Sequence, residues 1–182
     1  MTDPLALWRR PRSGCIHPVR MMIPSEQCDI AIVETPIDDL AGQSEILRFE
    51  CVMVMPEQHP LAEYHTLTPQ LVAREPIVSL YREHQTTQQL ERAFFEARIP
   101  WDPVIQSRLF ATSCEIVATG GGLAIVDPMT AQGYLSQGLV ARRFKPQVVL
   151  EIAITLPGEG PYSRLAQDFV ARMKAELHPF SL

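Results

Sequence analysis

Residues 112–128 have the sequence TSCEIVATGGGLAIVDP, and this stretch decides the fold class. Thr112-Ser113-Cys114-Glu115 has the S/T-x-x-E pattern of a capping box, which predicts that a helix begins there. The glycines at 120–122 then end that helix, because glycine readily adopts the left-handed conformation found after helix C-termini. Residues 123–126 are all apolar and predict a buried strand. A helix joined to a buried strand by a glycine turn indicates an α/β protein.

The same alternation extends outward over most of the chain. Further strands are predicted by short apolar runs at 29–33, 48–55, 76–81, 104–110, 139–144 and 148–156. Further helices are predicted to start at Thr68-Pro69, at Thr87, after Pro128 and near Ser163. Alternating strands and helices favour an open, mainly parallel sheet. Residues 1–27 contain four prolines and are expected to be irregular.

Composition excludes several classes of protein. The 182 residues suffice for one domain or two small lobes, and the net charge of -5 offers no overall attraction for a nucleic-acid backbone. No run approaches the roughly 20 apolar residues of a membrane span, so we expect a soluble chain without a membrane partner. The four cysteines form no C-x-x-C pair or disulfide framework, which indicates a cytoplasmic protein.

The sequence contains few of the features that catalysis requires. There is no G-x-S-x-G nucleophile motif, and the five histidines lack metal-ligand spacing, so neither a metal nor a cofactor is expected. Cys114 is the best available nucleophile, because a helix N-terminus favours a thiolate. No local base accompanies it. We therefore expect a protein that is not an enzyme, and keep a small enzyme that uses Cys114 as a remote alternative.

Polar side chains follow three of the predicted strands and mark a candidate ligand site. They are Thr35 after the first strand, Gln85, Thr86 and Thr87 after residues 76–81, and Thr112 and Ser113 after residues 104–110. Ligands of open α/β sheets bind at the carboxyl ends of strands, where helix N-termini add free amides and a positive dipole end. Neutral donors and acceptors suit reversible binding of a small polar molecule. The alternative is that Thr112 and Thr87 only cap their own helices.

The order of these motifs resembles that of the LysR-type transcriptional regulators. The segment 28–32 (CDIAI) is followed by 51–56 (CVMVMP), by His59-Pro60-Leu61-Ala62, and by the glycine-rich turn before the strand 123–126. The final amphipathic helix also fits, so the resemblance runs from about Cys28 to Leu177. It implies a two-lobed effector domain like a type II periplasmic binding protein, with the ligand held between the lobes.

The resemblance also implies partners and a division of the chain. Family members act as homo-oligomers and bind small effectors, often carboxylates or amino-acid derivatives; residues 126–131 and 142–144 look closest to members that answer to amino acids or opine-like compounds. Lobe two is expected at 61–137, and an incomplete lobe one with the hinge crossings at 28–60 and 138–182. The N-terminal winged helix-turn-helix is missing, so the domain is expected to be N-terminally truncated and to reach DNA only through that missing part. A stand-alone, transport-type solute-binding protein is the runner-up.

Overall fold

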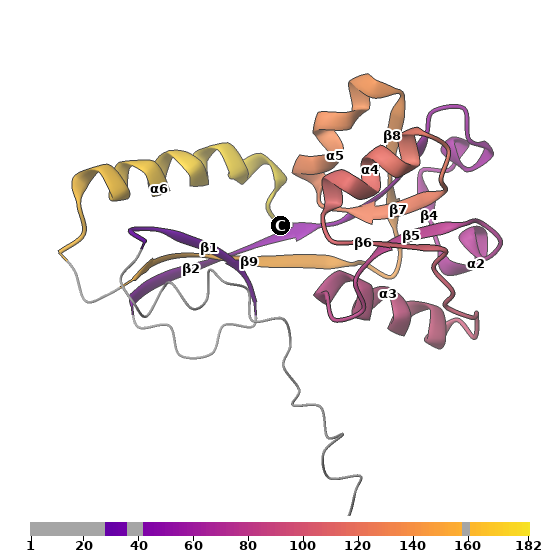
Figure 1. The fold of residues 1–182 in the computed structure, drawn as a ribbon, viewed down its shortest axis with the longest axis horizontal. Coiled ribbons are helices and arrows are strands. Elements are labelled where there is room, and N and C mark those ends of the chain that lie inside the picture. Colours follow the sequence, from indigo (N-terminus) through magenta and orange to yellow (C-terminus); the bar gives the residue numbers. More distant parts are fainter. Residues whose placement is uncertain (1–27, 36–41, 158–160) are drawn as a thin grey trace, which may run out of the picture.

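A computed structural model describes residues 28–35, 42–157 and 161–182, and their strands form two sheets. The smaller sheet is antiparallel and has the strand order β1-β9-β2, with β1 at Ala31–Glu34, β9 at Val149–Pro157 and β2 at Gly42–Glu50. The helix α6 (Arg164–Leu177) runs alongside this sheet (Figure 1). Ser163 caps α6 through its hydroxyl, as the sequence predicts.

The larger sheet has the strand order β4-β8-β3-β7-β5-β6. Its strands are β3 (Val52–Pro56), β4 (Thr66–Leu67), β5 (Ile77–Leu80), β6 (Ile105–Ser107), β7 (Leu123–Val126) and β8 (Leu139–Phe144). The remaining helices are α2 (Pro69–Val72), α3 (Gln85–Glu96), α4 (Phe110–Ala118) and α5 (Pro128–Tyr134), with short 3-10 turns at Pro60–Glu63, Leu135–Gln137 and His178–Phe180.

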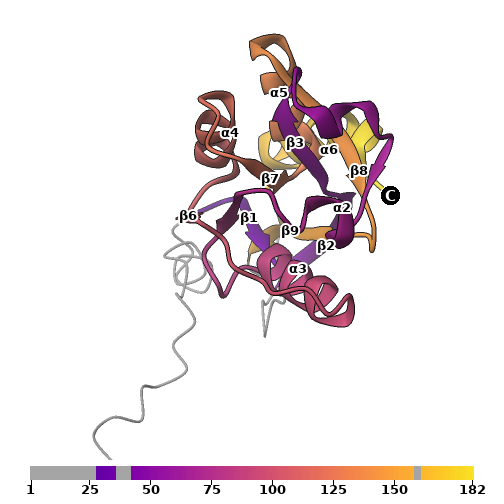
Figure 2. The same ribbon diagram turned by 90° about the vertical axis from the view of Figure 1, so that its right-hand side faces the viewer.

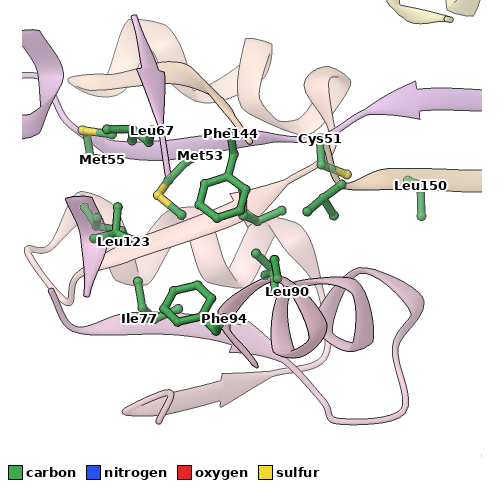
Figure 3. Close-up of a cluster of buried hydrophobic side chains, with 14 of the residues drawn as sticks. Cys51, Met53, Met55, Leu67, Ile77, Leu90, Phe94, Leu123, Phe144 and Leu150 are labelled. Carbon is green, nitrogen blue, oxygen red and sulfur yellow. The ribbon is translucent and has the colours of Figure 1, made fainter. Parts of the chain in front are cut away.

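Helices cover both faces of the larger sheet. On one face, Met53 and Leu123 pack against Phe94 of α3 (Figure 3). On the other, Val54 packs with Val117 of α4 and with α5. Figure 2 shows α3 and α4 on opposite sides of the strands. Burying the apolar face of each helix against a sheet is the main source of stability in such a layered fold.

The expectation of a single, mainly parallel sheet holds only for the larger sheet. Among the described residues, three of its five strand pairs are parallel (β4–β8, β5–β6 and β5–β7), whereas both pairs of the smaller sheet are antiparallel. The chain enters the larger sheet through β3 and returns to the smaller sheet from β8, so these two neighbours run in opposite directions.

The strand predicted at 48–55 is two strands, because the chain passes from one sheet to the other at Cys51. Cys51 is fully buried, and its backbone N–H donates to the C=O of Val148 at 2.8 Å. The larger sheet therefore includes β3 and β8, which lie outside the 61–137 segment expected as lobe two. The assignment of chain segments to lobes stays a prediction, and the expected irregular segment 1–27 lies outside the described residues.

Two of the predicted helix caps, Thr112 and Thr87, are displaced from the residues that the sequence favours. α4 begins at Phe110 with Leu109 as its N-cap, because the N–H of Ser113 already donates to the C=O of Leu109 within the helix. The capping-box prediction at Thr112 is therefore wrong. α3 begins at Gln85 rather than after Thr87, and the side chain of His84 caps it.

The glycine turn predicted at residues 120–122 is confirmed. Gly120 and Gly122 have φ angles of 85° and 127°, and the N–H of Leu123 donates to the C=O of Pro76 at 2.8 Å. A Cβ on Gly122 would overlap the carbonyl oxygen of Pro76. Glycine at 122 is therefore required both by its backbone conformation and by the close approach of Pro76, the residue before β5.

Gly122→Ala is expected to lower the free energy of unfolding by about 3 kcal/mol, because a strained φ and a backbone clash add together. Urea denaturation followed by circular dichroism measures the loss. Gly133→Ala is the matched control: a Cβ there meets nothing within 4 Å, and alanine in a helix should raise stability by about 0.5 kcal/mol. Equal effects of the two substitutions would contradict this assignment.

Candidate functional site

The first predicted ligand residue, Thr35, and the first residue of α3, Gln85, both form hydrogen bonds with Glu151 of β9. The N–H of Thr35 donates to the C=O of Glu151 at 3.1 Å, and its hydroxyl donates to the Glu151 carboxylate at 3.2 Å. The side-chain amide of Gln85 donates to the same C=O at 3.0 Å and accepts from the Glu151 N–H at 3.1 Å. Two residues 50 positions apart in sequence are thus brought to one point.

A buried histidine joins the same region. His84 is 3% exposed, and its Nε2 lies 2.8 Å from a carboxylate oxygen of Glu34. Its Nδ1 accepts the backbone N–H of Thr86 at 3.2 Å and lies 2.8 Å from the Thr86 hydroxyl. Because Nδ1 accepts a backbone N–H, the ring proton sits on Nε2, which donates to Glu34. The rings of Tyr81 and Phe110 pack edge-on against the imidazole.

We call Glu34, Thr35, His84, Gln85 and Glu151 the polar junction. It joins the end of β1, the start of α3 and the beginning of β9. The side chains of its two carboxylates are about one-third exposed, and Arg48 donates to the Glu151 carboxylate at 2.6 Å. Such a set of donors and acceptors can orient a small polar molecule.

The other predicted residues are placed differently. Thr87 is buried and its hydroxyl donates to the C=O of Leu80 at 3.2 Å. Ser113 is buried and shares a hydrogen bond of 2.7 Å with the hydroxyl of Ser107. Thr112 lies on the exposed face of α4 and takes part in none of the hydrogen bonds described above for the polar junction. The structure therefore brings together Thr35, Gln85 and Thr86, with Thr87 alongside them in α3.

Sequence reasoning missed His84, Glu151 and Arg48 as parts of this region. A signal for His84 existed, since it directly precedes Gln85-Thr86-Thr87 at a helix start, where a side-chain acceptor satisfies a free amide. Glu151 is the single charged residue in the strand predicted at 148–156. A lone charge in an apolar run often marks a special position, but its partners cannot be read from the sequence.

Catalysis through Cys114 has no support in the structure. Cys114 is the fifth residue of α4, and burial, with the charges of Asp127 and Glu115, raises the pKa of its thiol to about 12. At neutral pH the group is a thiol, not the thiolate that a nucleophile requires. In the described part of the chain, no three His, Cys, Asp or Glu side chains are grouped closely enough to hold a metal ion.

A separate groove lies between β2 and α6. Its volume is about 460 Å³, and its lining includes Glu45, Leu47, Lys174 and His178. Lys174 and Glu45 form an ion pair of 2.6 Å across it. None of the residues predicted from strand ends lines this groove. No helix in the described residues is long and apolar enough to cross a membrane.

Comparison with known proteins identifies relatives. Residues 18–178 match the family model described as the LysR substrate binding domain. The chain is 32% identical over 155 residues to the transcriptional activator protein LysR of Escherichia coli strain K12, which covers 84% of this chain and 50% of that protein. The chain thus spans half the length of this relative.

Solved structures show the same fold. A protein from Pseudomonas aeruginosa described as a LysR family transcriptional regulator has a TM-score of 0.72 at 16% identity, over 88% of this chain and 57% of that one. The effector-binding domain of QuiR in complex with shikimate has a TM-score of 0.66 at 17% identity, over 90% and 79%. This likeness confirms the predicted α/β effector-domain fold, similar to type II periplasmic binding proteins.

Substitution of His84 separates its two roles. His84→Ala should lower the free energy of unfolding by about 2 kcal/mol, because the cap of α3 and the partner of Glu34 are both lost. His84→Asn should recover roughly half of this loss, since asparagine caps helices well but does not reach Glu34. Thermal and urea unfolding measure both variants.

His59 supplies the control for that experiment. It caps a 3-10 turn through Nδ1 and lies 3.4 Å from Glu75 through Nε2, the same arrangement at a site remote in sequence and more exposed. His59→Ala should cost less than His84→Ala, because the imidazole of His59 is 20% exposed whereas that of His84 is 2% exposed, so less buried contact is lost. An equal loss for His84→Asn and His84→Ala would show that the contact with Glu34, and not the cap, accounts for the whole effect.

Proposed function

The chain belongs to the LysR substrate-binding domain family, and on this basis we propose that it is the ligand-sensing part of a transcriptional regulator. The match over residues 18–178 carries the proposal. Binding of a small metabolite would change the arrangement of the two sheets, and a DNA-binding part of the regulator would respond. The relatives named above are regulators, and no observation on the described residues favours the transport-type alternative.

The proposed effector is a small carboxylate or amino-acid derivative. One protein of the same fold, QuiR, binds shikimate through its effector-binding domain. The polar junction offers hydroxyl, amide and carboxylate groups where the three elements meet, which is the kind of polar lining that orients a small ligand. Amino-acid derivatives carry both charges, and so could use the carboxylates of Glu34 and Glu151 as well as neutral donors.

The proposed contacts are the six residues expected from strand ends: Thr35, Gln85, Thr86, Thr87, Thr112 and Ser113. Of these, Thr35 has the most accessible hydroxyl at the junction, because it is half-buried while Thr86 and Thr87 are buried. Buried members would shape the wall of the site, since their hydroxyls already bond to the protein. Thr112 would contact only a ligand that is long enough to extend from the junction over α4.

The remaining partners are proposed on the same basis. We propose that the chain associates with copies of itself, acts in the cytoplasm, has no catalytic activity and reaches DNA through a part of the regulator outside these 182 residues. The net charge of -5 fits a domain that does not itself bind a nucleic-acid backbone.

Calorimetric titration with a panel of amino acids, small carboxylates and shikimate tests the function. At least one compound should bind at a 1:1 ratio, and Thr35→Val should weaken its binding about tenfold, because one hydroxyl contact is lost without a change of shape. Thr119→Val is the matched control; the hydroxyl of this exposed threonine at the C-terminal end of α4 donates to the C=O of Ile116. Failure of every compound to bind would contradict the proposed ligand class.

A further inference from the structure

The two sides of β9 are paired differently. On one side it pairs with β2 over its whole length, from Val149 opposite Glu50 to Pro157 opposite Gly42. On the other side β1 pairs only with residues 152–155. The beginning of β9 therefore extends past the end of β1, and there its backbone faces α3. Backbone groups that lack a neighbouring strand need other partners when they are removed from water.

Two glutamines of α3 supply those partners. The side chain of Gln89 donates to the C=O of Val149 at 2.7 Å and accepts its N–H at 2.8 Å. Gln85, one turn earlier in the same helix, donates to the C=O of Glu151 at 3.0 Å and accepts its N–H at 3.1 Å. Residues four apart lie on one face of a helix, and alternate residues of a strand point their backbone groups to one side. The spacing of Gln85 and Gln89 along the helix matches that of Glu151 and Val149 along the strand, so one face of α3 can form hydrogen bonds with both strand residues.

The amide of each glutamine thus acts like the backbone of a neighbouring strand. It gives one donor and one acceptor to β9 at the point where β1 has ended. The N–H of Thr35, the first residue after β1, completes the series at the C=O of Glu151. On this side of β9, the backbone groups are therefore hydrogen-bonded first by β1, then by Thr35 and Gln85, and last by Gln89.

We infer that Gln85 and Gln89 form a clamp that fixes β9 to α3, and that Gln89 is a positioning residue of the proposed effector site. β9 belongs to the smaller sheet, whereas α3 packs on the larger one, so the clamp ties the two sheets together beside their connection. Glu151 holds Thr35 by two hydrogen bonds, so the position of Thr35 follows from that of β9. Both amide atoms of Gln85 serve the clamp, which makes Gln85 a positioning residue as well.

The assignment of a positioning role rests on the proposed function, whereas the clamp rests on the four hydrogen bonds alone. The test therefore measures amide hydrogen exchange of the whole 182-residue chain by NMR, without ligand. In Gln89→Leu the amide of Val149 should exchange roughly tenfold faster, because its acceptor is lost. The amide of Thr35 should also exchange at least twofold faster, although Gln89 does not touch it, because β9 is held less firmly.

Gln88→Leu is the matched control. Gln88 is the exposed neighbour of Gln89 in α3, and its side chain donates only to the C=O of Glu83. Exchange at Val149 and Thr35 should be unchanged in this variant. If Gln89→Leu fails to fold, Gln89→Glu replaces it: the carboxylate keeps an acceptor for the Val149 N–H but loses the donor, so exchange at Val149 and Thr35 should still rise, by about threefold.

Unchanged exchange at Val149 in a folded Gln89 variant would overturn the clamp. A faster Val149 amide with an unchanged Thr35 amide would overturn the positioning role, since the glutamine would then only cover the strand. Faster exchange at both amides supports the inference even in a chain that binds no compound of the panel; that combination would reject the proposed function and leave the clamp in place.

Discussion

One antiparallel ribbon holds both sheets, and the rest of the structure depends on it. The chain from Gly42 to Pro56 runs opposite the chain from Leu139 to Pro157, first as β2 with β9 and then as β3 with β8. Between these two pairings, the hydrogen bond from Cys51 to Val148 keeps the crossing segments together in a fully buried position. Among the described residues, the chain passes between the two sheets only from β2 to β3 and from β8 to β9. Any relative movement of the sheets must therefore bend this ribbon.

The polar junction follows from that constraint. Because β9 continues past the end of β1, its first residues need partners, and α3 is the element that the larger sheet places beside them. Glu151 then connects Thr35 of one sheet to Gln85 of the helix on the other. A ligand held among such groups would change how firmly the sheets are tied, which is how a sensor can convert binding into a conformational signal.

The preferences of neighbouring residues were enough to predict most of the helices and strands. The pairing of strands that are distant in sequence could not be predicted in this way. The glycine turn at 120–122 and the strand after it follow from backbone preferences alone. The direction and sheet of each strand do not, since the apolar run around Cys51 looks the same whether it forms one strand or two. His84 was missed because Thr87 also fits a cap pattern, and only the tertiary contact with Glu34 distinguishes them. The apolar stripe predicted for α6 is present, yet Leu165 is 80% and Phe169 53% exposed.

We propose that the effector binds at the polar junction. The most direct test is to follow backbone amide chemical shifts by NMR while the chain is titrated with a compound that binds. If the effector binds at the junction, the largest saturable shifts will occur at Thr35, Thr86 and Glu151, with smaller shifts at their neighbours in α3. Shifts confined to the groove between β2 and α6, around Leu47 and Ala175, with no change at the junction, would contradict it.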